Sequence, residues 1–250
     1  MYTVDTEAVI DYLERYVWVQ SPTPGAPIPF RCNTIQNALF RQARSLSLEG
    51  GVDGTVKPRQ VGSSTGVLAW CSALAGHFCP GINICIVAPH GTMLAIREKW
   101  RIIHDYLASA PSARYSPLSA DNADMARYAN RSRINWVDAG ETKNSAQSVS
   151  LGDTIHLLIL MELAKYPWDR FVWRVIKPAA ERAKAPILID STPPENPGYG
   201  AVYLSLLRMC KAKVPGHRLL FFPWWLEDSY RADTKAEYPL SDDERALVDV

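Results

Sequence analysis

The chain has 250 residues, of which 47% are hydrophobic and 21% are charged, and its formal net charge at pH 7 is +1. A soluble globular chain of this length can bury a substantial core, as one large domain or as one domain with appendages. The near-neutral charge excludes binding of nucleic acid through the overall field, so any such contact requires a local basic patch.

Cysteine usage and the absence of targeting signals predict a cytoplasmic protein. The five cysteines form no C-x-x-C pair, and most lie in apolar runs, where a free thiol packs as a small hydrophobe. The N-terminal sequence carries acidic residues and lacks the apolar run of a signal peptide. The most apolar segment, Leu157 to Met161, is too short to span a bilayer.

The first residues, 1–29, are expected to form a helix and a proline-rich linker. Val9, Ile10 and Leu13 recur at helical spacing, and residues 21–29 contain several prolines that end the helical pattern. This helix should dock on the main body of the protein.

A second helix is predicted within residues 29–43, PFRCNTIQNALFRQA. Ile35, Leu39 and Phe40 fall on one face of it, and Gln36 lies in its first turns. The Gln36 amide offers both a donor and an acceptor, which suits the N6 and N7 edge of adenine. The alternative is an ordinary surface glutamine.

The stretch Gly54 to Trp70, GTVKPRQVGSSTGVLAW, is typical of a phosphate-binding loop followed by a helix. Gly62, Ser63 and Ser64 stand where such a loop has Gly-Lys-Ser/Thr, and Lys57 stands at the position of its opening glycine. Backbone N–H groups and a helix N-terminus would then face one anionic group. A capped helix start without a ligand is the alternative.

The later residues alternate between strand-like and helix-like runs. Such alternation favours a mainly parallel sheet with helices on both faces. Strands are expected at 82–88, 133–138, 154–161 and 186–189, helices after Thr92 and Pro167, and a polar loop at 109–130.

Polar residues end two of these strands, where parallel sheets bind their ligands. The Glu162 carboxylate can orient and deprotonate a water that attacks a terminal phosphate, or it simply marks where the strand leaves the core. The hydroxyls of Ser191 and Thr192 can sense a third phosphate, or form a turn. His156, within the first of these strands, is interpreted as a packed core histidine.

Five stretches follow one another in the order found in a known family. They are PFRCNTIQNAL, KPRQVGSST, LLILMELAKYPW, ILIDSTPPENPGYGAVY and FFPWWLEDSYR, and they extend from Pro29 to Arg231. Through them the chain resembles the ATPase part of the large terminase subunit, the genome-packaging motor of tailed bacteriophages. The resemblance implies an α/β fold of the P-loop NTPase (ASCE) type, with a central, mainly parallel sheet flanked by helices on both faces.

The resemblance also implies a domain plan. Residues 30–212 would be the P-loop ATPase core, preceded by the helix and linker at 1–29. Residues 213–250 would be a linker toward the RNase H-like nuclease domain of the family, which this chain ends before reaching. We therefore expect the motor half without the nuclease.

The resemblance assigns roles to the loop. Lys57 would supply the ammonium normally given by the lysine that Ser63 replaces, Ser64 would bind Mg²⁺, and Arg59 and Glu162 would be catalytic. The implied ATP-binding residues are Gln36, with its adenine contact, and Lys57, Arg59, Gln60, Gly62, Ser63, Ser64 and Thr65.

One departure from the family pattern concerns the metal. Met161 replaces the acidic residue often found before the catalytic glutamate, which leaves Mg²⁺ with fewer protein ligands. Ser191 and Thr192 match the coupling motif of the family. A neighbouring subunit's arginine can complete the transition state in such rings, and the candidates for this finger are Arg127, Arg131 and Arg133.

The implied function is an ATP-hydrolysing motor that moves double-stranded viral DNA into the procapsid, using ATP and Mg²⁺. Its partners would be the portal protein, the small terminase subunit and further copies of the chain in a ring, in the host cell cytoplasm and without a membrane. Two alternatives remain open. One is another nucleic-acid-stimulated, helicase-like ATPase, and the other is a catalytically silent assembly module whose loop is only a structural turn.

Overall fold

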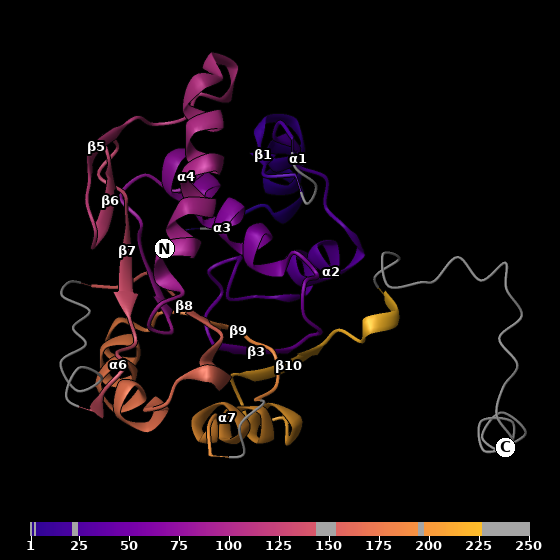
Figure 1. Cartoon of the computed structure of the whole chain (residues 1–250), viewed down its shortest axis with the longest axis vertical. Coiled ribbons are helices and arrows are strands. Elements are labelled where there is room, and N and C mark those ends of the chain that lie inside the picture. The colour runs from indigo at the N-terminus through magenta and orange to yellow at the C-terminus, as the bar shows by residue number, and fades with distance from the viewer. Residues whose placement is uncertain (1, 3, 22–24, 144–153, 195–197, 227–250) are drawn as a thin grey trace, which may run out of the picture.

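The computed structural model describes residues 2, 4–21, 25–143, 154–194 and 198–226. At its centre is an eight-stranded sheet (Figure 1). The strands from β10 to β7 run parallel to one another, and the last two are antiparallel. Their order is β10 (His217–Phe221), β3 (Val52–Val56), β9 (Ile187–Asp190), β8 (Leu157–Met161), β4 (Asn83–Ala88), β7 (Arg133–Asp138), β6 (Met125–Tyr128) and β5 (Leu118–Asp121).

Helices cover both faces of the sheet, as the alternating pattern predicts. On one side lie α1 (Thr6–Tyr16), α2 (Thr34–Gln42), α3 (Ser63–Ala73) and α4 (Met93–Ser109), and on the other α6 (Asp169–Ala183) and α7 (Ala201–Lys211) (Figure 1). Shorter elements are the antiparallel pair β1 (Trp18–Val19) and β2 (Ile28–Pro29), a π-helical turn at Leu74–Phe78, and 3-10 turns at Pro111–Ala113, Leu163–Lys165 and Trp224–Leu226.

The sheet divides the interior into two apolar cores. Ile84 and Ile86 of β4 belong to the core under α3, whereas Cys85 and Val87 belong to the core under α6. Successive side chains of a strand point to opposite faces, so a strand buried on both faces reads as one continuous apolar run. The expected strands in this region are thereby confirmed.

Local capping explains where the first helices begin. Asp5 Oδ1 accepts hydrogen bonds from the Glu7 and Ala8 N–H groups at the start of α1. Before α4, Thr92 occupies the expected position, but its hydroxyl donates to the Pro89 carbonyl (2.9 Å) and caps no N–H group of the helix. The helix therefore begins there without a side-chain cap.

The prediction of a loop at 109–130 is wrong for half of that segment. β5 and β6 form an antiparallel hairpin there, and β6 pairs with β7 at the edge of the sheet. Three of the four residues of β5 are exposed, so the strand carries no apolar alternation for a sequence pattern to detect. Backbone pairing with an existing edge creates these strands.

The core continues beyond the predicted boundary at residue 212. β10 pairs with β3 in parallel register, and Arg218 Nη2 contacts Asp53 Oδ1 (2.5 Å) inside the sheet. Asp53 is fully buried, and its second oxygen accepts from the Ser45 N–H (2.7 Å). Residues 217–221 are thus part of the domain, while 227–250 of the predicted linker lie outside the described residues.

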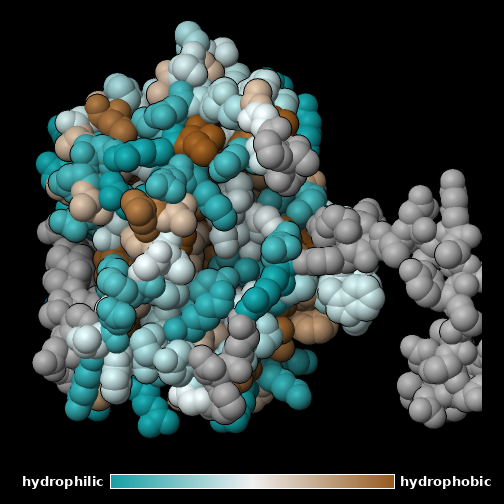
Figure 2. All heavy atoms as spheres, viewed as in Figure 1, coloured by the Kyte–Doolittle hydropathy of each residue, from teal (hydrophilic) through white to brown (hydrophobic). Residues whose placement is uncertain are grey.

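The face of the molecule in Figure 2 is mainly hydrophilic, with hydrophobic side chains scattered over it. None of the helices in the described part of the chain is long and apolar enough to cross a membrane.

The pair Asp53 and Arg218 allows a test of β10 as a core strand. Arg218→Met removes the cation and keeps an unbranched stem, which leaves a buried carboxylate with one partner fewer. We expect the free energy of unfolding to fall by about 1–3 kcal/mol in urea titrations followed by circular dichroism. The control Arg208→Met, at an exposed position of α7, should change it by less than about 0.5 kcal/mol. An equal change in both variants would contradict the role assigned to β10.

Candidate functional site

An open pocket of about 290 Å³ lies where the loop after β3 meets the carboxyl ends of β8 and β9. The structure brings most of the predicted site residues together there, and leaves Gln36, Ser191 and the three candidate finger arginines out of its lining. The lining consists of Lys57, Arg59, Gln60, Val61, Gly62, Ser63, Ser64, Thr65, Lys99, Glu162, Lys165 and Thr192.

The loop owes its shape to a glycine. Gly62 precedes α3 with φ 70° and ψ 4°, a left-handed conformation that glycine adopts at little cost. A Cβ at this position would also lie 2.9 Å from Gln36 Nε2. The resulting turn presents the N-terminus of α3 to the pocket, and the partial positive charge of a helix N-terminus favours an anion there.

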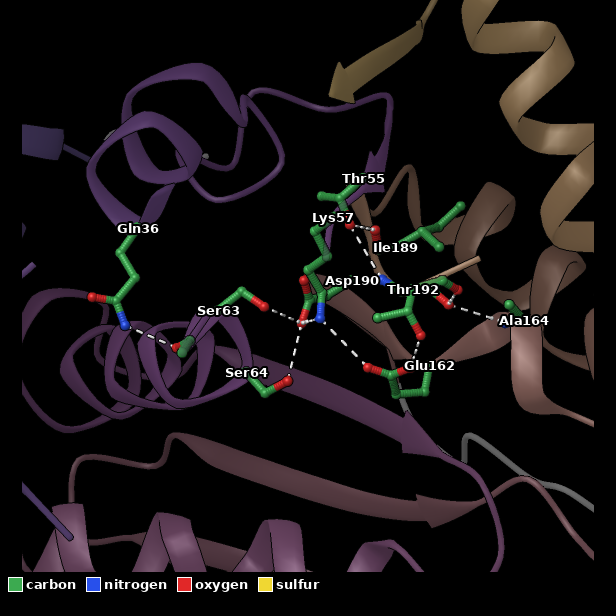
Figure 3. Close-up of polar contacts among 12 residues, drawn as sticks. Gln36, Thr55, Lys57, Ser63, Ser64, Glu162, Ala164, Ile189, Asp190 and Thr192 are labelled. Carbon is green, nitrogen blue, oxygen red and sulfur yellow. Dashed lines mark hydrogen bonds and ion pairs between the residues drawn. The ribbon is translucent and has the colours of Figure 1, made fainter. Parts of the chain in front are cut away.

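Lys57 is the centre of the charged cluster. Its side chain is only 5% exposed, and its Nζ lies 3.4 Å from Glu162 Oε1 and 3.7 Å from Asp190 Oδ2 (Figure 3). Burial lowers the pKa of the Lys57 ammonium, but the two carboxylates outweigh burial and the pKa is raised. A single cation therefore links the ends of β3, β8 and β9.

Glu162 directly follows β8 and adopts a left-handed conformation, with φ 55°. Its Oε2 accepts a hydrogen bond from Thr192 Oγ1 (2.9 Å) and lies 3.1 Å from Lys165 Nζ. Burial raises the pKa of the Glu162 carboxyl, but the charges of Lys57 and Lys165 outweigh it and the pKa is lowered. The group is held as a carboxylate that faces the pocket.

Asp190 is the residue of this cluster that the sequence interpretation missed. It ends β9 and is fully buried, and its Oδ2 accepts hydrogen bonds from Ser63 Oγ and Ser64 Oγ (both 3.2 Å). Burial is the largest cause of its raised pKa, which Lys57 opposes and Glu162 reinforces. A carboxylate that ends a buried strand is the same signal that singled out Glu162, and it was available for Asp190 too.

The two predicted coupling residues connect neighbouring strand ends. Ser191 Oγ accepts from the Ala164 N–H (3.1 Å), and the Ser191 N–H donates to Thr55 Oγ1 (3.2 Å). Thr192 donates to Glu162, as described above. Both hydroxyls are therefore engaged with the turn that carries Glu162, although only Thr192 lines the pocket.

Gln36 is buried against the back of the loop. Its Nε2 donates to the Gly62 carbonyl (2.8 Å), and its Oε1 accepts from the Asn33 N–H (3.0 Å) in a capping box at the start of α2. These contacts fix the loop to α2. Contact of Gln36 with adenine stays a prediction.

A second hollow, also of about 290 Å³, adjoins the first. Val19, Ile102 and Ile103 give it an apolar wall. An elongated depression with one charged end and one apolar end matches the two chemical halves of a nucleotide. The two hollows share the residues Gln60, Gly62, Thr65 and Lys99.

The arginines predicted as fingers lie at the opposite edge of the sheet. Arg127, Arg131 and Arg133 line an open pocket of about 610 Å³ beside Asn83, which begins β4. His156 also lines it, immediately before β8 and only partly buried, and its Nδ1 accepts from the Asn83 N–H (2.9 Å), so it is not a core histidine within the strand. At about 3.3 Å per residue, five strand residues put roughly 17 Å between this edge and Glu162.

The residues present fit a magnesium ion that is held mostly by phosphates and water. No group of three or more His, Cys, Asp and Glu side chains is placed to hold a metal in the described ranges. Magnesium at nucleotide sites needs only one or two protein oxygens, however. The Ser64 hydroxyl lines the pocket, and Asp190 Oδ1 is a buried carboxylate oxygen with no hydrogen-bond partner among the described residues.

No protein-family model and no curated protein matches the sequence of this chain. Among solved structures, the HK97 bacteriophage large terminase superimposes with a TM-score of 0.62 and 18% identity over 94% of this chain. The large terminase ATPase domain of Thermus phage P74-26 gives a TM-score of 0.51 and 18% identity over 78% of this chain and 82% of that domain.

The large terminase of another thermophilic bacteriophage, in complex with ADP, gives a TM-score of 0.51 and 16% identity over 86% of this chain. This chain spans 46% of the HK97 chain and 48% of the ADP-bound terminase, so it corresponds to less than half of either protein. The fold of this chain is that of the ATPase domain of a bacteriophage large terminase, an α/β P-loop NTPase fold.

Proposed function

We propose that this chain is the ATP-hydrolysing motor domain of a viral DNA-packaging terminase large subunit, acting on double-stranded DNA. The observation that carries the proposal is the buried Lys57 ammonium, which stands between Glu162 and Asp190 at a phosphate-loop pocket. The terminase ATPase fold supports it, as does the ADP bound by one of the similar terminases. The partners would be the portal protein, the small terminase subunit and further copies in a ring, in the host cell cytoplasm.

ATP binds, in this proposal, by replacing the internal partners of Lys57. The ammonium leaves the two carboxylates and contacts the β- and γ-phosphates, while N–H groups at the start of α3 hold the same oxygens. Arg59, Gln60 and Thr65 complete the cradle from the pocket wall. The Ser64 hydroxyl would hold a magnesium ion, which supplies charge neutralisation at the phosphate oxygens.

Glu162 is the proposed general base. It accepts a proton from water as the water oxygen attacks the γ-phosphorus and ADP departs. The charge of Lys57 holds the pKa of this carboxyl down before ATP binds. Transfer of the ammonium to the phosphates removes part of that effect, so the carboxylate becomes a stronger base when substrate is present.

Ser191 and Thr192 are proposed to report the state of the phosphates. Thr192 holds the Glu162 carboxylate, and Ser191 holds the turn at Ala164. A shift of Glu162 on loss of the γ-phosphate would therefore displace the end of β9 and the chain that follows it. Such a displacement is a route from hydrolysis to motion of bound DNA.

The silent-module alternative is disfavoured by the cost of the cluster. Removal of an ammonium and two carboxylates from water costs several kcal/mol per ion, which a purely structural turn does not require. A helicase-like ATPase would use the same pocket, and the DNA that stimulates it would distinguish it from a packaging motor.

An arginine finger, if present, acts between subunits in this proposal. Arg127, Arg131 and Arg133 lie too far from the pocket of their own chain to reach a nucleotide in it. They would project into the pocket of the next copy in a head-to-tail ring.

Nucleotide affinity should depend on Lys57. Lys57→Ala removes the only lysine of the loop, and we expect ATP binding to weaken by roughly 10–100-fold, the loss expected for a charged hydrogen-bonding partner. Titration with a fluorescent ATP analogue would measure it, with thermal melting as a check of folding. Lys177→Ala, at an exposed site on α6, should bind normally. An unchanged affinity of the folded Lys57 variant would return the loop to a simple capped helix start.

Glu162→Gln should separate binding from chemistry. The amide keeps the size of the side chain but removes its charge and basicity, so ATP affinity should be nearly retained. Hydrolysis should fall by roughly two to four orders of magnitude, as on loss of a general base. The two measurements are an ATP titration and a phosphate-release assay on the same protein. Retained hydrolysis would remove Glu162 from the catalytic role.

Hydrolysis should also depend on assembly. The rate per subunit should rise with protein concentration over the range where light scattering detects association, because the finger comes from a neighbour. Alanine at one of positions 127, 131 and 133 should abolish that rise, by roughly a thousandfold in the assembled state. Arg174→Ala, on the exposed side of α6, should keep it. A rate per subunit that stays flat through association would contradict a finger in trans.

A further inference from the structure

Asp190 is a buried carboxylate to which the hydrolysis described above gives no role. It is the register partner of Met161 on the neighbouring parallel strand. Register partners point to the same face of a sheet, and Met161 packs into the core under α3. Asp190 thus stands beside the very position where the terminase resemblance expects a carboxylate and this chain has methionine.

The contacts of Asp190 lead directly to the phosphate loop. Its Oδ2 accepts from the hydroxyls of Ser63 and Ser64 at 3.2 Å and lies 3.7 Å from Lys57 Nζ (Figure 3). A hydroxyl has one proton, so a serine that donates it to a carboxylate keeps its lone pairs for another partner. For Ser64, which lines the pocket, those lone pairs suit a cation.

The other oxygen of Asp190 is unexplained by the protein alone. Oδ1 is buried and has no hydrogen-bond partner in the part of the chain that the structure describes. Buried polar atoms without a partner are costly, and they often mark the place of a water or an ion. A structural ion pair with Lys57 accounts for Oδ2 and leaves Oδ1 unsatisfied.

We propose that Asp190 is the carboxylate of the magnesium site, supplied by β9 in place of the one that β8 lacks at Met161. It is a positioning residue: it fixes the Ser64 hydroxyl as a donor, so that the lone pairs of Ser64 face the metal, and its Oδ1 accepts from water bound to that ion. The inference rests on the proposed nucleotide site, because the metal arrives with the nucleotide.

The test is the effect of magnesium on nucleotide affinity, without hydrolysis. A fluorescent ADP analogue is titrated into the full chain in excess Mg²⁺ and again in EDTA. Asp190→Asn should reduce the tightening by Mg²⁺ about 10–100-fold, the usual cost of losing a group that orients a metal ligand. Metal-free affinity should be retained or increase, because a negative charge near the phosphates is gone. The matched control, Asp169→Asn, replaces a buried carboxylate of α6 that does not line the pocket, and should keep the wild-type ratio.

A second variant uses the strand register. Met161→Asp combined with Asp190→Asn moves the carboxylate to the neighbouring strand and should restore most of the magnesium effect. If Asp190→Asn alone does not fold, the double variant decides the matter by keeping or losing that effect.

Three results would overturn the inference while leaving the proposed function in place. These are an unchanged magnesium effect in folded Asp190→Asn, an equal loss of affinity with and without the metal, and a folded double variant without the effect. Wild-type protein that binds no nucleotide in either buffer would instead overturn the proposed function itself.

Discussion

The site depends on one buried ammonium. Lys57 is nearly excluded from water, and burial alone would favour its neutral form, but Glu162 and Asp190 keep it charged. The same cation holds together the ends of three strands that belong to distant parts of the sequence. An arrangement of this kind is stable without ligand and still has a better partner available, since a nucleotide offers more negative charge than two carboxylates that must also repel each other.

The fold makes this arrangement precise. β8 and β9 are buried along their whole length between two apolar cores, so the residues that end them have little freedom to move. Hydrogen bonds from Ser191 and Thr192 then tie the turn after β8 to the end of β9. Gln36 secures the loop from the opposite side through the Gly62 carbonyl. Rigid strands thus carry the charges, and short polar links carry the information that passes between them.

Much of this could be predicted from the sequence, because the buried strands and amphipathic helices leave periodic patterns and the loop leaves a local motif. The β5–β6 hairpin could not, because its short, exposed strands are defined by pairing with β7 and not by their own residues. Strand order has the same limit: the proximity of Asp190 to Met161 follows from register across a sheet. The position of Arg127, Arg131 and Arg133 away from the pocket also appears only when the sheet is assembled.

The central claim is that Lys57 exchanges its carboxylate partners for phosphates, and a crystal structure with a non-hydrolysable ATP analogue and Mg²⁺ tests it most directly. The account predicts the terminal phosphates in the pocket between the loop and Glu162, with Lys57 Nζ in contact with them and withdrawn from Asp190. A nucleotide bound elsewhere, or one bound in the pocket while Lys57 keeps both carboxylates and contacts no phosphate, would contradict it.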